Sequence, residues 1–108
     1  MGGTPQLPAG KKVALSILAG PLKGKVFQIS KPRIVLGRAG ADIVVDDPEI
    51  SRKHCALEVQ GMRAKLIDLG SRNGTFVNEK RVEISELQHL SEFHIGRNTF
   101  LFTIIDKT

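Results

Sequence analysis

The amino-acid sequence predicts an all-β protein, a β-sandwich of two antiparallel or mixed sheets with about eleven short strands. Short runs of Val, Ile, Leu and Phe alternate with polar residues at the period of two that half-buried strands require. Clusters of Gly, Pro, Asn and Asp separate these runs, and the 11 Gly residues suit many turns. No stretch carries the apolar period of an amphipathic helix. These three observations together favour a sandwich.

The length of 108 residues fits one domain, which we expect to span residues 11–108. The apolar fraction of 41% supports a modest core, built mainly from Val, Ile and Leu because the chain has five Phe and neither Trp nor Tyr. Residues 1–10 contain three Gly and two Pro and have little to bury. We therefore expect them to form a disordered tail.

The first half of the chain contains four runs that we expect to be strands, each followed by a turn signal. The first run begins at Lys12, where Val13, Leu15 and Ile17 alternate with smaller residues. The last run leads into an acidic turn, which we expect to be a solvated bend. The four expected strands cover residues 12–17, 26–29, 34–36 and 42–45.

A β-hairpin is predicted next, with strands over 55–59 and 64–69 and a break at Gln60, Gly61 and Met62. The segments that enter and leave a hairpin lie at the same end of it. The polar loop 50–54 and the polar loop 70–75 should therefore meet. Beyond them, turns are expected at 78–81 and 96–98, and strands at 75–77, 82–84, 92–95 and 99–105.

The residues brought together by this hairpin suit the binding of an oxyanion. Ser51 and Arg52 lie in the first loop, and Arg72 and Asn73 lie in the second. The strand over 34–36 ends in a further basic turn that carries Arg38. Guanidiniums, a hydroxyl and an amide are the donors that a phosphate group accepts from.

Three sequence blocks in order resemble the forkhead-associated (FHA) domain, a phosphothreonine-peptide-binding β-sandwich. The blocks are Gly37-Arg38, Ser51-Arg52-x-His54, and Ser71-x-Asn73-Gly74-Thr75 followed by Asn78. The resemblance covers residues 11–105, nearly the whole chain, and the three blocks together are specific where each alone is weak.

This resemblance implies a role for each matching residue. Arg38 and Ser51 would hold the phosphate, Asn73 would hold the peptide main chain, and His54 would be a buried brace between loops. The residues implied to contact the phosphopeptide are Arg38, Ser51, Arg52, Arg72 and Asn73. Those implied to hold the loops are Gly37, His54, Ser71, Gly74, Thr75 and Asn78.

One position departs from the family. FHA domains usually have a Gly-Asp turn before the penultimate strand, where this chain has Leu90-Ser91. Leu adopts the positive φ of such a glycine only at an energetic cost, so we expect a different local turn.

The function that the resemblance implies is a phosphothreonine-dependent protein–protein interaction module in Ser/Thr-kinase signalling. Its partner would be a phosphothreonine-containing protein, either a Ser/Thr kinase or a kinase substrate, and the domain would be monomeric. Two alternatives stay open: a phosphate-independent interaction domain, and a basic nucleic-acid-binding domain suggested by the net charge of +5. The second lacks aromatic stacking residues and a recognition helix.

Catalysis, a metal site and a cofactor are not expected. His54 and Cys55 adjoin Ser51, but no acid is spaced to orient the histidine, and three scattered His with one Cys lack ligand spacing. A single Cys excludes an intrachain disulfide, and no apolar run reaches the roughly 18 residues of a membrane span. The N-terminus does not resemble a signal peptide. We therefore expect a cytoplasmic location.

Overall fold

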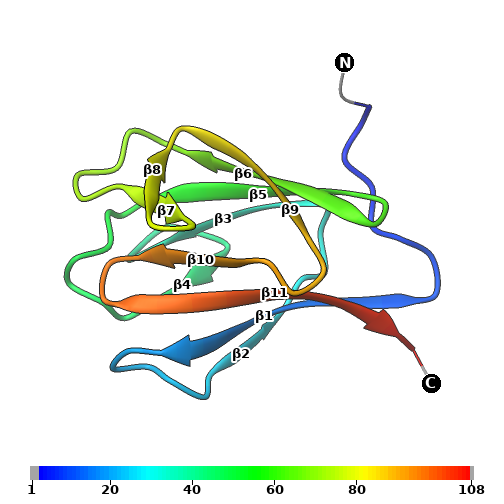
Figure 1. The fold of residues 1–108 in the computed structure, drawn as a ribbon, viewed down its shortest axis with the longest axis horizontal. Helices are drawn as coiled ribbons and strands as arrows, with labels where there is room; N and C mark the ends of the chain where they lie inside the picture. The colour runs from blue at the N-terminus through cyan, green and yellow to red at the C-terminus, as the bar shows by residue number, and fades with distance from the viewer. Residues whose placement is uncertain (1–2, 108) are drawn as a thin grey trace.

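A computed structural model describes residues 3–107 and contains eleven strands in two sheets (Figure 1). The six-stranded sheet has the order β2-β1-β11-β10-β7-β8 and the five-stranded sheet the order β4-β3-β5-β6-β9. All pairs are antiparallel except the parallel pair β3 and β4, so the predicted β-sandwich with mixed sheets is confirmed. No helix in residues 3–107 is long and apolar enough to cross a membrane. The strands are β1 (Lys11–Ala19), β2 (Val26–Gln28), β3 (Arg33–Gly37), β4 (Ile43–Val44), β5 (Cys55–Gln60), β6 (Arg63–Asp68), β7 (Thr75–Val77), β8 (Lys80–Val82), β9 (Ile84–Gln88), β10 (Glu92–Ile95) and β11 (Asn98–Asp106).

The core forms between the inner faces of the two sheets, as the alternation along the strands requires. Leu15 of β1 lies opposite Phe102 of β11, and both are fully buried. The rings of Phe93 and Phe100 stack with centroids 5.1 Å apart. Leu57 and Leu66 form the corresponding buried pair of the facing sheet. The core is therefore mainly aliphatic, as predicted, with three buried Phe rings at one sheet.

The predicted hairpin is confirmed by the register of β5 and β6, which runs from Cys55 opposite Asp68 to Gln60 opposite Arg63. Gly61 turns the chain at one end with φ 61°. The loops that precede Cys55 and follow Asp68 consequently leave the sheet side by side. This geometry places the two polar loops at the same end of the sandwich.

The predicted strand over 82–84 is wrong, because the chain changes sheets there. β8 ends at Val82 and pairs with β7, whereas β9 begins at Ile84 and pairs with β6 of the other sheet. The expected four-residue turn at 78–81 is a two-residue turn, in which Asn78 and Glu79 have φ values of 52° and 65°. Two positive φ values match the twist of a tight hairpin, which leaves Lys80 free to pair with Val77.

The turn at Leu90 also differs from expectation. Leu90 adopts φ 74°, the left-handed conformation that glycine would supply. Its N–H donates to the carbonyl of Phe102 at 2.8 Å, and the Ser91 N–H donates to Gln88 at 2.9 Å. These backbone hydrogen bonds hold Leu90 in a conformation that leucine disfavours. The departure from the family therefore changes the side chain at this position and not the backbone conformation.

Part of the predicted tail is attached to the sandwich. The Gln6 N–H donates to Val59 at 2.8 Å, the Gly61 N–H donates to Gln6 at 3.0 Å, and Leu7 packs against the core. The expectation of disorder over residues 1–10 therefore does not hold at Gln6 and Leu7. Its first two positions, Met1 and Gly2, lie outside the described residues.

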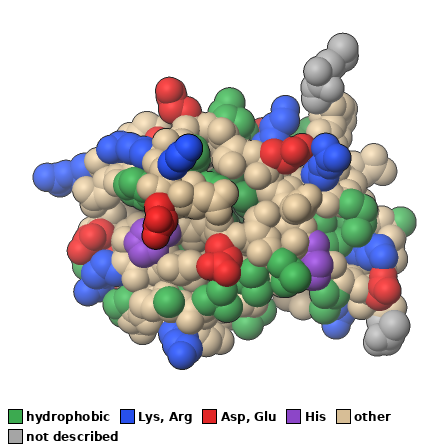
Figure 2. Space-filling view, in the orientation of Figure 1, with side chains coloured by type: hydrophobic (Ala, Val, Ile, Leu, Met, Phe, Trp, Pro, Cys, Tyr) green, Lys and Arg blue, Asp and Glu red, His purple; other side chains and the backbone are tan. Residues whose placement is uncertain are grey.

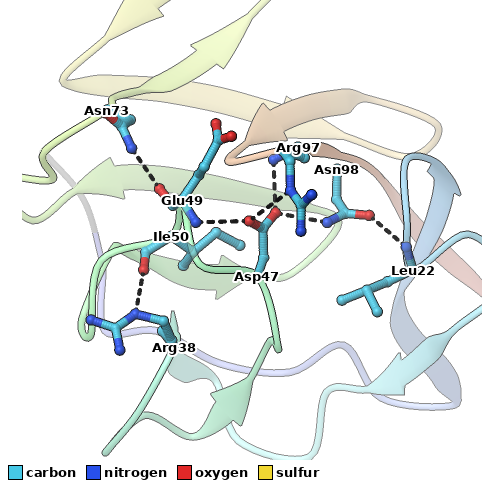
Figure 3. A network of polar contacts seen from close by, with 8 residues as sticks. All are labelled: Leu22, Arg38, Asp47, Glu49, Ile50, Asn73, Arg97 and Asn98. Carbon is cyan, nitrogen blue, oxygen red and sulfur yellow. Dashed lines mark hydrogen bonds and ion pairs between the residues drawn. The ribbon is translucent and has the colours of Figure 1, made fainter.

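Asp47 links the loop after β4 to the turn between β10 and β11, and its side chain is fully buried (Figure 3). Its carboxylate accepts hydrogen bonds from the N–H groups of Glu49 and Arg97 at 2.9 and 2.7 Å, and from the Asn98 amide at 2.8 Å. The Arg97 Nε lies 3.5 Å from it. The expectation of a solvated acidic turn is wrong for Asp47, since the fold buries this carboxylate with four donors.

Burial alone would raise the pKa of Asp47, but the hydrogen bonds from Arg97, Glu49 and Asn98 outweigh it and lower the pKa below its ordinary value. A carboxyl group with a lowered folded-state pKa stabilises the fold above its unfolded pKa. That stabilisation is lost as the pH falls through the lower folded-state pKa. Asp47 thus contributes its full share near neutral pH and little in strong acid.

We predict that Asp47→Ala lowers the free energy of unfolding by about 3 kcal/mol at neutral pH, because it leaves buried donors without an acceptor. The difference from the wild-type protein should shrink below about pH 3.8, the ordinary value for Asp. Urea unfolding at several pH values measures both effects. Asp46→Ala, which removes the neighbouring exposed carboxylate, is the matched control. Equal losses for the two variants would contradict the role given to Asp47.

Candidate functional site

The turn after β3 lies directly against the loop before β5. The Arg38 N–H donates to the Ser51 carbonyl at 2.9 Å, and the Arg38 Nε donates to the Ile50 carbonyl at 3.0 Å (Figure 3). The Arg38 side chain is exposed, and its two terminal amino groups have no partner among residues 3–107. The backbone of one loop thus aims the guanidinium of another toward solvent.

Gly37 permits this close approach. A Cβ at Gly37 would lie 1.7 Å from the carbonyl oxygen of Arg52, which no backbone can accommodate without moving. The glycine is fixed by contact with a neighbouring chain segment and not by a positive φ. It brings Arg38 and Arg52 to the same short stretch of surface.

His54 connects the first loop to the second. Its ring is fully buried, and its Nδ1 lies 3.0 Å from the Ser51 nitrogen. Because a backbone N–H can only donate, Nδ1 accepts and the proton sits on Nε2, which donates to the Gly74 carbonyl at 2.8 Å. This neutral tautomer uses both ring nitrogens to hold loop backbone. The position corresponds to the brace that the resemblance implies.

Asp68, at the end of β6, organises the loop that follows it. One carboxylate oxygen accepts the hydroxyls of Ser71 and Thr75 at 2.6 and 2.8 Å, and the other accepts the N–H groups of Gly70 and Ser71 at 3.1 and 3.0 Å. Burial alone would raise the pKa of Asp68, but the Ser71 and Thr75 hydrogen bonds lower it below its ordinary value. The loop therefore wraps around an ionised carboxylate.

Two further hydrogen bonds join the loops. The Arg72 N–H donates to the Ser51 hydroxyl oxygen at 3.0 Å, and the Asn73 amide donates to the Glu49 carbonyl at 2.8 Å. The hydroxyl hydrogen of Ser51 has no acceptor among residues 3–107. It remains available to a ligand, while the oxygen is held in place by the neighbouring loop.

The remaining predicted loop residues lie beneath this surface or at its margin. Gly74 has φ 96°, and its N–H donates to the Ser71 hydroxyl at 3.0 Å. Ser71 and Thr75 are buried. Asn78 lies outside the loop, in the two-residue turn between β7 and β8. The structure thus brings together all the predicted residues except Asn78, which stands one short strand away.

The exposed surface of the three loops is cationic. Arg38, Arg52 and Lys53 line one shallow depression, and Arg72 lies on the adjoining loop. Within residues 3–107 none of these four side chains forms an ion pair with a carboxylate. Their charge is consequently available to an anion.

Asp47 and Asp68 were missed as site residues by the sequence analysis. Each is an Asp two or three residues before backbone N–H groups that it accepts from, a pattern typical of an Asx-turn. That local pattern was a usable signal for both. Nothing in the sequence, however, distinguishes the buried Asp47 from its exposed neighbour Asp46.

A family model described as the cytoplasmic domain of the inner membrane component of T3SS matches residues 16–106. The glycogen accumulation regulator GarA of Mycolicibacterium smegmatis is 33% identical over 94% of this chain, and the oxoglutarate dehydrogenase inhibitor of Corynebacterium efficiens is 34% identical over 93%. The chain spans 65% and 70% of the length of these two proteins.

A solved structure from a study of phosphothreonine-dependent FHA domain interactions superposes with a TM-score of 0.76 at 28% identity, covering 85% of this chain and 95% of that one. The family model, the sequence relatives and the solved structure each match most of the chain. On this evidence, the chain belongs to the forkhead-associated (FHA) domain family.

Proposed function

We propose that this domain binds a phosphothreonine in an extended segment of a partner protein. The observation that carries the proposal is the set of unpaired cations around Ser51. The Ser51 hydroxyl has no acceptor among residues 3–107, and His54 fixes the loop that carries it. A phosphate monoester has a charge of about −1.5 to −2 near pH 7 and accepts several hydrogen bonds. The solved structure from a study of phosphothreonine-dependent FHA domain interactions has the same fold.

In this proposal, Arg38 and Ser51 are the main phosphate ligands. The terminal amino groups of Arg38 form a planar fork that suits two phosphate oxygens, and the Ser51 hydroxyl adds one shorter bond. Arg52 and Arg72 flank them. Charge-assisted bonds contribute about 1.5–3 kcal/mol each, and ordering a flexible peptide offsets much of this. An affinity on the order of micromolar, about −8 kcal/mol, follows.

In this proposal, Asn73 holds the peptide main chain beside the phosphothreonine. One amide N–H donates to Glu49, which leaves the other N–H and the carbonyl oxygen for a ligand. A neutral amide held in this way supplies direction and geometry without charge. Recognition would then divide between the charge of the arginines and the geometry of Asn73.

A structural role suits His54 and Cys55 better than a catalytic one. Both nitrogens of His54 are engaged by the backbone, so neither can accept a substrate proton. Burial and the nearby charge of Asp68 raise the pKa of the Cys55 thiol to about 12, which leaves no thiolate near pH 7. Among residues 3–107, no His, Cys, Asp and Glu side chains group as metal ligands do.

We propose a cytoplasmic location, because the matching family model describes a cytoplasmic domain. We further propose that residues 11–108 act as a monomeric recognition unit. A Ser/Thr kinase or one of its substrates is the kind of partner that carries the required mark. The names of the two relatives describe regulators, one of glycogen accumulation and one that inhibits oxoglutarate dehydrogenase. A regulatory role through a bound enzyme is consistent with both.

We predict that Arg38→Ala abolishes phosphothreonine-peptide binding while the domain stays folded, because the exposed guanidinium serves the ligand. The loss should exceed about 2 kcal/mol, or roughly thirtyfold. Titration calorimetry against matched phosphorylated and unphosphorylated peptides measures it, with a thermal melt for each variant. Lys12→Ala removes an equal charge from the exposed start of β1 and should bind normally. Wild-type affinity in the Arg38 variant would refute the site.

We predict that Asn73→Ala weakens phosphopeptide binding by about 1–3 kcal/mol but leaves the weak binding of inorganic phosphate nearly unchanged. Arg38→Ala should weaken both ligands, because its contribution is mainly charge. NMR titrations of each variant with phosphopeptide and with phosphate compare the two. Duplex DNA serves as a further ligand, to test attraction to any polyanion. Unchanged peptide affinity in the Asn73 variant would contradict a contact between Asn73 and the peptide, and the second loop would then serve only as a turn.

A further inference from the structure

A hollow beside the proposed phosphate site, here named the edge groove, lies where the two sheets separate. β8 ends one sheet and β9 ends the other, and the hollow has a volume of about 1220 Å³. Its lining begins at Glu49 and Asn73, continues along β7, β9 and β10, and reaches Leu90. It exceeds the roughly 300–1,000 Å³ of a typical small-molecule pocket, so a chain segment fits it better.

The edge groove is acidic in a chain with net charge +5. No Lys or Arg belongs to its lining as described, whereas four carboxylates do. Within residues 3–107, only Glu86 among them forms an ion pair, with Arg63 at 3.2 Å. Figure 2 shows acidic side chains and a histidine over β10 on this face, and the exposed side chain of Glu49 lies between Asn73 and Arg97 in Figure 3. The four acids are Glu49, Glu79, Glu86 and Glu92.

Leu90 gives the groove an unusual apolar end. It holds φ 74° where a glycine would be unstrained, and 59% of its surface is exposed. An exposed aliphatic side chain and a left-handed backbone are both unfavourable in the free protein, and local strain of this kind is found at ligand-binding positions. Half-buried Phe76 and Val77 add apolar surface toward the other end.

We propose that the edge groove binds the same phosphorylated segment beyond its phosphothreonine, taking a lysine or arginine at its carboxylates and an apolar side chain against Leu90. This deepens the proposed function and rests on it. Asn73 belongs to both surfaces, so a segment held by Asn73 beside its phosphate is directed into the groove.

The arrangement makes binding conditional on the phosphate. A basic segment without phosphate meets the cationic loops at Arg38 and Arg72 and is repelled there, although its lysine suits the groove. Phosphorylation changes the sign at one end of the segment and leaves the other end unchanged. Opposite charges on the domain then match opposite charges on the ligand.

The test uses a peptide library with a fixed phosphothreonine and randomised flanking positions. The wild-type domain should enrich Lys or Arg together with Leu, Ile or Val. Glu92→Lys and Glu79→Lys should abolish the basic preference while binding still depends on Arg38. Glu83→Lys, a charge reversal at an exposed residue outside the groove, should keep it.

The Leu90→Gly variant provides a second test, in which a loss of peptide affinity cannot be explained by a loss of folding stability. Glycine suits φ 74°, so the melting temperature should stay the same or rise. Affinity for the selected peptide should fall about five- to tenfold, because one apolar contact is lost. Val26→Ala shortens a comparably exposed aliphatic side chain on β2, outside the groove, and should bind normally.

Each outcome bears on a defined claim. Arg38-dependent binding without basic or apolar preference overturns the groove proposal and leaves the phosphothreonine site standing. Wild-type affinity of Leu90→Gly overturns the apolar contact. Failure of the wild-type domain to bind any phosphothreonine peptide overturns the groove proposal and the proposed function together.

Discussion

The buried ring of His54 is the contact on which the rest of the binding end depends. The loops around Ser51 and Gly74 contain no regular structure, so no ladder of hydrogen bonds fixes their shape. His54 joins them directly, accepting from one backbone and donating to the other. A ring with one donor and one acceptor on opposite sides can do this only in a single tautomer. The loop geometry is therefore tied to a neutral histidine sealed from solvent.

Two carboxylates complete that framework in a way that keeps the arginines free. Asp47 and Asp68 direct their oxygens to backbone N–H groups and to hydroxyl and amide donors of the loops. An acid paired with Arg38 or Arg72 would have to be displaced by an incoming phosphate. Because the structural acids are occupied within the fold, the cationic surface is preorganised for an external anion.

Periodicity was enough to predict the sandwich, most of its strands and the meeting of the two loops. The hairpin argument succeeded because β6 alternates between buried and exposed residues and the turn between the two strands contains Gly61. The change of sheets after Val82 could not be predicted, since β8 and β9 are short and separated only by Glu83. The φ of Leu90 follows from backbone bonds to Phe102 that are remote in sequence, and these override the preference of the residue.

The site itself was predictable only in part for a similar reason. The ordered blocks at Arg38, Ser51 and Asn73 indicated where the candidate binding surface lies. The sequence did not indicate that Asp47 and Asp68 support this surface from inside the fold. Asp46 and Asp47 are neighbouring Asp residues in the same acidic turn. Only the contacts with the distant turn at Arg97 and Asn98 decide which of the two is buried. Supporting residues of this kind depend on tertiary contacts, whereas the proposed ligand contacts follow a local motif.

Net charge is a poor guide to the partner, because the charges compensate one another on some parts of the surface and not on others. On the outer face of the five-stranded sheet, Arg33 lies opposite Glu58, Glu58 opposite Lys65, and Lys65 opposite Glu86. Alternating signs across neighbouring strands compensate one another, so this sheet offers no continuous basic surface to nucleic acid. Among the described residues, the four cations at the loops around Ser51 form no ion pair, and neither do three of the four acids that line the edge groove beside them. A ligand that satisfies both must carry both signs a short distance apart, which a phosphorylated basic segment does and a uniform polyanion does not.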